Sequence, residues 1–539
     1  MNNKTQNLIT VLNIIVTIFI VYFCTLMLYN SVLDGDVIFE GLPVSADKFI
    51  YPVHGRYIAE VFTRTIGIFS HFDFHPMNFV CTGSAYMKIC FSVLMCYLAT
   101  GFFFIFSRKN ILMPFILLAS FSYFFIYRVF EIYNITQFFG YTSMMIFYMA
   151  FWLIFIKHFV NQTLPDKKDI LLNSLLALAL GTATEFMNIS TTFTLFYLSI
   201  YSLFIFGKEA SWDLSKIWMR FKNPGSGLYF PVLLFFTGMF ISYGNPSFWA
   251  QAKNDKNIEI TGNFFLNTIN TFGEFVHSYL KLIIIEHSVQ LIIIAVLFLI
   301  ISIMVKFKKA NSRFLIISLA LFLGVMSFYF SLCLFGKTYY QEGLFWLSHV
   351  GLQKILDFAL YIVIVLNVGY IYSLFKNKIS LFILNAFLIA YICSFSLGLT
   401  DTYKDIKEYS AFLKKIRVYT YKVDKICNFY FLQNKIAIIP IEYIPYLRGN
   451  ADITGFTYDY INNTKIVKDS AYLNYFAYAY KNINRYGYKF ASEKEALRLY
   501  QKAGGWFTEE ELSFLDFNRL KNKNYIMNKP EIKDKILYY

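Results

Sequence analysis

The sequence predicts an all-α polytopic membrane protein with about eleven transmembrane helices and a small α/β extracytoplasmic domain at its C-terminal end. Of its 539 residues, 57% are hydrophobic, 20% are aromatic and only 15% are charged, and the mean hydropathy is +0.48. A soluble domain could not bury that much apolar surface. The apolar residues fall in runs of about 20, the length at which a helix crosses the hydrocarbon core of a bilayer.

The expected spans are the apolar runs between charged residues. They are 8–29, 79–107, 111–127, 138–156, 170–187, 189–206, 228–243, 287–305, 314–334, 355–375 and 380–399. The first run exceeds the roughly 7–15 apolar residues of a signal peptide and lacks a small-residue cleavage site, so we expect it to remain as the first span. Seven cysteines fall mostly in such runs without CxxC spacing. They are expected to be buried packing residues rather than disulfide or zinc ligands.

Lysine and arginine gather in alternate connections, and this bias orients the chain. The basic connections are 108–110, 157–169, 207–223, 306–313 and 376–378. The positive-inside rule places them in the cytoplasm together with the N-terminus. The remaining loops, and with an odd number of spans also the C-terminus, are then expected outside. These outer loops are 30–78, 128–137, 244–286 and 335–354.

The chain changes character near residue 400. Residues 1–399 form the expected transmembrane domain, whereas 400–539 carry more charge and shorter apolar runs. Two capping-box patterns, Ser492 to Glu495 and Thr508 to Glu511, predict helix starts. Lys435 to Pro440 has the pattern of a short buried strand. The net charge of +15 favours a surface beside anionic lipid headgroups over nucleic-acid binding.

A polar island follows the first span. It contains Asp34-Gly-Asp36 and, further on, His54-Gly-Arg56. Two carboxylates one residue apart repel each other unless a cation or a hydrogen-bonding partner intervenes, so this loop is a candidate for chemistry as well as for ordinary loop solvation. Apolar residues then recur at helical spacing, which predicts an amphipathic helix along the membrane interface. Its apolar face is expected to carry Tyr57, Ile58, Val61, Phe62, Ile66 and Phe69.

A further carboxylate, Glu185, lies at the junction of the fifth and sixth expected spans without a soluble loop around it. A charge at that depth costs a few kcal/mol, roughly 2.5–3.5 on insertion scales. We therefore expect Glu185 to face a polar cavity together with Asn188 and Ser190. The alternative is a carboxylate that caps the turn between the two spans.

These features together resemble the C-class (GT-C) superfamily of polytopic membrane glycosyltransferases that use polyprenyl-phosphate-sugar donors. The shared features are a first long span, an outer loop that opens with Asp34-Gly-Asp36, a downstream Gly-Arg before a juxtamembrane helix, about eleven spans and an outer C-terminal domain. The resemblance implies an enzyme of the bacterial inner (cytoplasmic) membrane. It would move a sugar from a polyprenyl-phosphate carrier to an extracytoplasmic glycan or lipid-linked acceptor, in cell-envelope polysaccharide biosynthesis.

Under this resemblance Asp34, Asp36 and Glu185 are the candidate catalytic residues. Transfer requires a base for the acceptor hydroxyl, and it is left open which aspartate is that base or whether a divalent cation, Mg²⁺ or Mn²⁺, is held instead. The departing lipid phosphate gains negative charge and needs cationic neighbours. The candidate substrate-binding residues are His54, Arg56, Arg128, Lys253, Tyr339, Trp346 and His349.

Two other enzyme or transport functions stay open. An O-antigen-type polymerase or ligase also has many spans and usually relies on arginines in outer loops. A transporter or flippase of polysaccharide or lipid would carry charged or broken helices near mid-membrane, and a non-enzymatic assembly protein is a third alternative. The sequence contains no P-loop or Gly-rich nucleotide cradle, which disfavours a nucleotide-sugar donor used from the cytoplasm. The expected partners are membrane lipids, the lipid-linked donor and the acceptor, and not nucleic acid.

Overall fold

The structure of the chain is a computed structural model in which part of the sequence is described. The described residues are 3–28, 57–59, 61–62, 76–106, 112–126, 142–161, 163, 165–209, 228–246, 284–285, 287–340, 350–375, 385–386, 389, 422, 425–426, 429–430, 432–433, 435–440 and 488–507.

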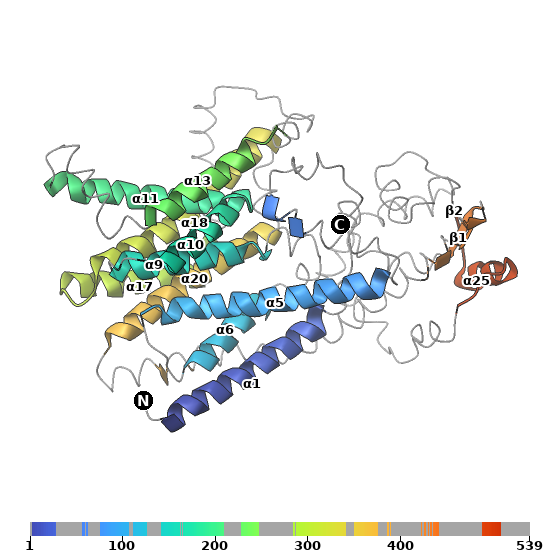
Figure 1. Ribbon diagram of the computed structural model, residues 1–539, viewed down its shortest axis with the longest axis horizontal. Helices are drawn as coiled ribbons and strands as arrows, with labels where there is room; N and C mark the ends of the chain where they lie inside the picture. Colours follow the sequence, from blue (N-terminus) through green and yellow to red (C-terminus); the bar gives the residue numbers. More distant parts are fainter. Residues whose placement is uncertain are drawn as a thin grey trace.

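Ten long helices make up the described membrane part, and they form one elongated bundle (Figure 1). They are α1 (Asn3–Leu28), α5 (Pro76–Phe104), α6 (Met113–Ile126), α9 (Met145–Asn161), α10 (Lys167–Gly181), α11 (Glu185–Glu209), α13 (Tyr229–Tyr243), α17 (Ser288–Lys306), α18 (Ser312–Tyr340) and α20 (Val350–Leu374). Each coincides with one of the expected spans, with shifted ends. The expected span 380–399 lies almost wholly outside the described residues.

Three described helices are long and apolar enough to cross a membrane: Gln6–Thr25 in α1, Tyr86–Phe104 in α5 and Ser288–Lys306 in α17. Shorter apolar stretches follow the same pattern in α6, α9, α13, α18 and α20. The chain is therefore a helical membrane protein, and the number of eleven spans stays a prediction.

In α5, Tyr86, Cys90 and Leu94 form an exposed stripe at i, i+4 and i+8. The prediction of a buried cysteine was thus wrong for Cys90, which lies on this exposed stripe of α5, whereas Cys24 and Cys96 are buried.

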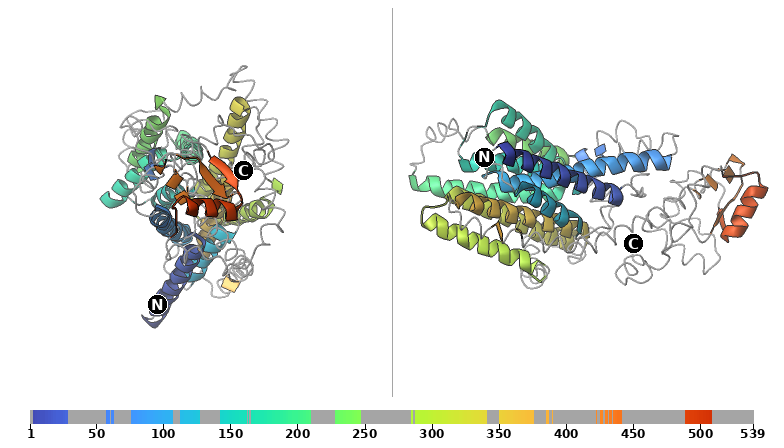
Figure 2. Two further views of the ribbon diagram at one scale, coloured as in Figure 1. Left: turned by 90° about the vertical axis from the view of Figure 1, so that its right-hand side faces the viewer. Right: turned by 90° about the horizontal axis from the view of Figure 1, so that it is seen from below.

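The described C-terminal residues contain two strands and one helix, which lie beyond one end of the bundle (Figure 2). Strand β1 (Ala437–Pro440) pairs in parallel with β2 (Tyr488–Ala491), with Ala437 opposite Tyr488. Helix α25 (Glu493–Lys502) begins where the capping-box pattern predicts, because the Ser492 hydroxyl accepts the Glu495 N–H at 3.4 Å. Both views place these elements opposite the N-terminal end of α1. An independent domain over 400–539 and its extracytoplasmic location stay predictions, and Thr508 lies outside the described residues.

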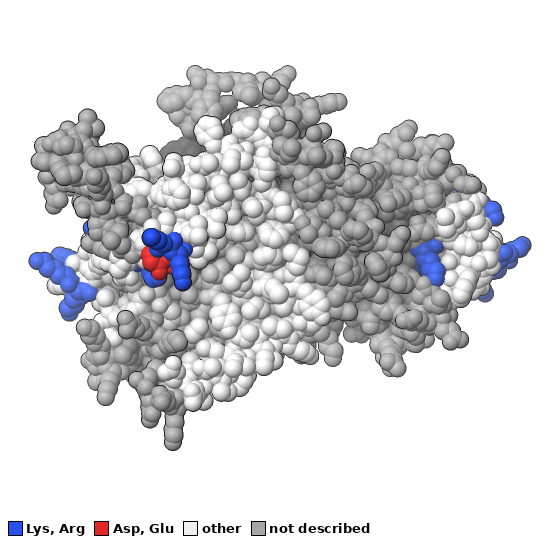
Figure 3. Space-filling model, viewed as in Figure 1, with Lys and Arg blue, Asp and Glu red and all other residues white. Residues whose placement is uncertain are grey.

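Several basic connections meet at the other end of the bundle. The Asn311 side-chain amide donates to the Val160 carbonyl at 3.1 Å, and the Asn311 N–H donates to the Tyr370 hydroxyl at 2.7 Å. The Phe106 ring lies 5.3 Å from that of Phe314 and 5.1 Å from that of Tyr370. The C-terminal ends of α5, α9, α17 and α20 thus lie together at one end of the bundle. This is expected if the loops that follow these helices lie on one side of a membrane. On the face seen in Figure 3, the described lysine and arginine side chains gather toward this end and around the C-terminal elements.

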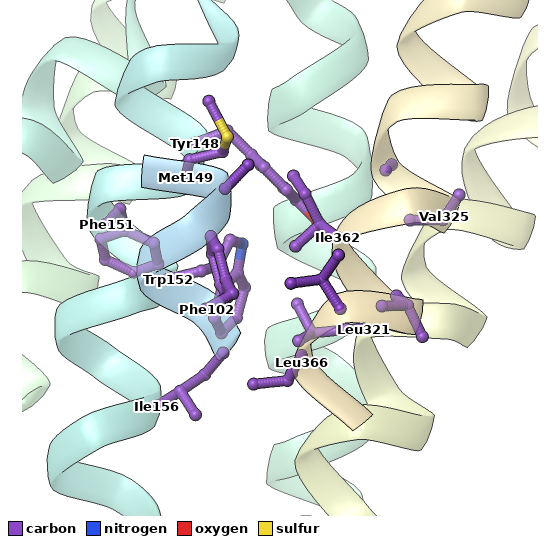
Figure 4. Close-up of a cluster of buried hydrophobic side chains, with 14 of the residues drawn as sticks. Phe102, Tyr148, Met149, Phe151, Trp152, Ile156, Leu321, Val325, Ile362 and Leu366 are labelled. Atoms are coloured by element: carbon purple, nitrogen blue, oxygen red, sulfur yellow. The ribbon is translucent and has the colours of Figure 1, made fainter. Parts of the chain in front are cut away.

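The largest buried cluster lies where α5, α9, α18 and α20 meet (Figure 4). Its labelled members are Phe102, Tyr148, Met149, Phe151, Trp152, Ile156, Leu321, Val325, Ile362 and Leu366. The Phe151 and Trp152 rings pack edge to face with centroids 5.1 Å apart. Lipid tails are as apolar as these side chains, so van der Waals packing, rather than transfer out of water, holds helices together where they contact lipid.

Glycines and interhelical hydrogen bonds supply the closest helix contacts. An ideal Cβ at Gly181 of α10 would lie 2.3 Å from the Phe235 carbonyl oxygen of α13, so the two backbones touch there. Gly238 meets the same crossing from the α13 side. Elsewhere, Asn367 of α20 donates to the Ser318 hydroxyl of α18 at 2.6 Å. Close small-residue contacts and polar bonds between helices are typical of membrane bundles.

Candidate functional site

A short piece of the first outer loop packs against one end of the helix bundle. We call residues 57–59 and 61–62 the first-loop segment; all of them are helical. The Ile58 N–H donates to the Thr182 carbonyl just beyond α10 at 3.4 Å, and the Asn245 amide, just beyond α13, donates to the Tyr57 hydroxyl at 3.3 Å. The Phe62 ring meets Phe91 of α5 edge to face, with centroids 5.4 Å apart. Four chain segments that are distant in sequence therefore converge here.

The first-loop segment packs part of its expected apolar face against the bundle. Ile58 and Phe62 pack against the core cluster and Ala59 is buried. Val61, also expected on the apolar face, is 48% exposed at the surface of the protein. A helix along the membrane interface turns such apolar positions toward lipid, so this exposure does not contradict the expected face.

The turn between α10 and α11 forms the second part of this site. Helix α10 ends at Gly181, and Glu185 is the first residue of α11. The Asn188 amide crosses the turn and donates to the Gly181 carbonyl at 2.9 Å. Asn188 and Ser190, the expected neighbours of Glu185, are both buried. The side chain of Glu185 lies outside the described set, so the choice between a cavity carboxylate and a capping carboxylate stays open.

Most of the other candidates fall outside the described residues. This group consists of Asp34, Asp36, His54, Arg56, Arg128, Lys253, Trp346 and His349. Tyr339 belongs to α18, and its side chain is not described. The sequence nevertheless links three candidates to the convergence, since His54 and Arg56 come just before Tyr57 and Glu185 follows Thr184.

Among the described residues, several polar side chains near the turn have a buried atom without a hydrogen-bond partner. Three of these groups are the Thr184 hydroxyl, the Asn188 carbonyl oxygen and the Ser242 hydroxyl at the end of α13. Their residues are 1%, 2% and 7% exposed. Leaving such a group unpaired costs about 1–3 kcal/mol. Thr182 differs from them, because its hydroxyl donates to the carbonyls of Leu178 and Ala179, at 3.2 and 3.1 Å.

Sequence reasoning missed Lys88. This lysine is fully buried in α5, at the start of the candidate span Tyr86–Phe104. Phe91, less than one helical turn further on, is the residue that contacts Phe62 of the first-loop segment. A buried charge within a membrane span is costly and by default marks a functional site. The signal was present in the sequence, because Lys88 is the lone charged residue of the run 79–107.

A charged cluster at the other end of the bundle has a structural explanation. The Asp169 carboxylate lies 2.7 Å from Nε2 of buried His158 and 3.0 Å from Nζ of Lys157. Nδ1 of His158 lies 2.9 Å from the Thr163 hydroxyl. The hydrogen bond with His158, more than the one with Lys157, holds the pKa of Asp169 below its usual value. Asp166 caps α10 by accepting the Asp169 N–H, so these residues fix the short connection from α9 to α10.

Within the described ranges, no group of three or more His, Cys, Asp or Glu residues is placed to hold a metal ion. Asp34 and Asp36, to which the Mg²⁺ or Mn²⁺ hypothesis applies, lie outside those ranges. Comparison with family models, with curated proteins and with solved structures found no match for this chain.

Proposed function

We propose that the chain is a membrane glycosyltransferase of the C class, which moves a sugar from a polyprenyl-phosphate carrier to an extracytoplasmic glycan or lipid-linked acceptor. The observation that supports it is the contact of Ile58 with Thr182. That contact joins the stretch following His54-Gly-Arg56 to the turn that precedes Glu185. Tyr57 and Thr184, the described neighbours in sequence of Arg56 and Glu185, belong with Lys88 to one end of an apolar bundle. We propose that a lipid-linked substrate enters this end from the side.

In the proposed reaction, the acceptor hydroxyl attacks the anomeric carbon while Asp34 or Asp36 takes its proton. The bond between that carbon and the phosphate oxygen breaks, and the phosphate keeps the electron pair. Positive groups should face the oxygen on which this charge develops. Lys88, Arg56 and His54 are the proposed cations, and the resemblance to the C class implies inversion at the anomeric carbon. Glu185 is proposed to hold or deprotonate the acceptor.

The proposed orientation follows from the basic connections. Lys306, Lys308, Lys309 and Arg313 lie at the end where α9 and α17 terminate, and the positive-inside rule assigns that end to the cytoplasm. The first-loop segment would then face the outside of the bacterial inner membrane. Polyprenyl-linked sugars are consumed on that side, in keeping with the proposed reaction.

A transporter or flippase of polysaccharide or lipid is the second candidate. The observation that favours it is Lys88, because fully buried charges within spans also mark substrate pathways. A transporter would move the lipid-linked sugar across sealed vesicles without forming a new glycosidic bond.

Purified protein should be incubated with polyprenyl-phosphate hexose and a crude cell-envelope acceptor, and the acceptor analysed by mass spectrometry. We expect a gain of one hexose, strongly reduced in Glu185→Gln. Asp169→Asn is the matched control, since it neutralises a carboxylate at the opposite end of the bundle and should keep transfer. Movement of the lipid across proteoliposomes with no hexose gain would favour the transporter and overturn the proposed enzyme.

A further inference from the structure

Three of the buried polar atoms without a hydrogen-bond partner in the described structure come from the start of α11 and the nearby end of α13. Thr184 and Asn188 are one helical turn apart at the start of α11, and Asn188 is held in place through its bond to Gly181. Ser242 lies one turn beyond Gly238, which meets Gly181 at the crossing of α10 and α13. The three side chains therefore come from the start of α11 and from the end of α13, both close to the crossing of α10 and α13.

Their burial has no explanation in the fold itself. Polar groups in a membrane bundle lack bulk water and are normally satisfied by protein. Within the described structure the Asn188 carbonyl oxygen and the hydroxyls of Thr184 and Ser242 have no such partner. Valine, leucine and alanine would fill similar space at these positions without an unpaired atom. Polar side chains whose burial lowers stability in this way are typical of binding sites.

We infer that Thr184, Asn188 and Ser242 form a subsite for a neutral, hydroxyl-rich group, namely the sugar ring of the lipid-linked substrate. Hydroxyls can donate and accept, and an amide oxygen accepts, so the set matches sugar hydroxyls. A phosphate carries only acceptors at neutral pH, and the Asn188 oxygen would repel it. This inference rests on the proposed function and names the part of the substrate that is recognised here.

The chain offers a matched pair for the test. Thr184→Val removes an unpaired hydroxyl, whereas Thr182→Val removes a hydroxyl that is bonded to Leu178 and Ala179. The two threonines lie two residues apart, and the substitution is the same. We therefore expect Thr184→Val to leave the melting temperature unchanged or raised, and Thr182→Val to lower it.

Binding is measured as the shift in melting temperature with two probes, a short-chain isoprenyl phosphate hexose and the same isoprenyl phosphate without the sugar. The difference between the two shifts reports the sugar. For Thr184→Val we expect the affinity for the hexose-bearing probe to fall about tenfold, which corresponds to one lost hydrogen bond. The affinity for the sugar-free probe should not change, and Thr182→Val should bind both as the wild type does.

Equal hexose binding by Thr184→Val and wild type would overturn the subsite, as would a wild-type protein that does not distinguish the two probes. Failure of the proposed function gives a different result. Sugar-dependent binding that is lost in Thr184→Val, without transfer to any acceptor, would keep the subsite and reject the enzyme.

Discussion

Replacing Gly181 with alanine should disturb both the stability of the bundle and the proposed site. An ideal Cβ at this position would lie 2.3 Å from the Phe235 oxygen and 2.9 Å from the Met239 nitrogen, where ordinary contacts begin at 3.4 Å. Both obstacles are backbone atoms, so α10 and α13 must move apart by about 1 Å. Overpacking of this kind costs about 1–3 kcal/mol, and the better helix propensity of alanine returns at most about 1 kcal/mol.

The same separation of α10 and α13 should also displace the candidate functional site. The Gly181 carbonyl accepts the Asn188 amide, and the next carbonyl, that of Thr182, accepts the Ile58 N–H. We therefore expect Gly181→Ala to lower sugar transfer even at temperatures well below its melting point.

Gly101→Ala is the control for this change. The three atoms nearest to its Cβ would all belong to the Leu153 side chain, the closest at 3.2 Å, and a side chain can rotate away. Thermal unfolding in detergent, followed by transfer assays at a temperature where both variants are folded, measures the two effects. If Gly181→Ala matched Gly101→Ala in melting temperature and in transfer, the described crossing of α10 and α13 would be refuted.

Three further changes test other parts of the structure. Lys88→Met should lower transfer about 10²-fold, as for removal of one charge-stabilising donor, whereas Lys88→Arg should retain part of it; full activity of the methionine variant would rule out the proposed phosphate contact. Asp169→Asn should lower the melting temperature near neutral pH. The hydrogen bond with His158 lowers the pKa of Asp169 in the folded state. The Asp169 carboxylate therefore stabilises the folded protein above its unfolded pKa of about 3.9, and this stabilisation is lost as the pH falls through its folded pKa. The melting temperatures of the wild type and Asp169→Asn should thus become equal in acid. Gly505→Ala should destabilise the C-terminal elements, since its Cβ would lie 2.3 Å from the buried Tyr500 ring; unchanged proteolysis of these elements would contradict that packing.

Hydrophobic runs located the helices well, because a span must be apolar over its whole length. Their ends were harder to locate. The expected span 138–156 corresponds to α9, which continues to Asn161. Lys157 and His158 suggested a loop, yet both are helical and pair with Asp169. A helix end depends on caps and partners as well as on polarity, and the partner lies on the next helix.

The candidate site was predictable only in part. The break between the apolar runs 170–187 and 189–206 predicted a turn close to Glu185. The turn lies a few residues earlier, because α10 ends at Gly181 and Glu185 is already the first residue of α11. The contact of the first-loop segment with Thr182 could not be predicted, because a single sequence carries no information on which distant segments meet. Lys88 was overlooked because hydropathy averaged over a span hides one charge. The roles of Asp34 and Asp36 stay predictions.

The most direct test of the glycosyltransferase proposal is the rate of hexose transfer from polyprenyl-phosphate hexose by the purified wild type, Asp34→Asn and Asp36→Asn, compared at equal amounts of folded protein. Asparagine keeps the size of the side chain and removes the base and the charge. We predict transfer by the wild type and a fall of about 10²-fold or more in at least one variant. Normal transfer by both variants would contradict the assignment of the first loop as the active site, and the absence of transfer by the wild type would contradict the proposed function itself.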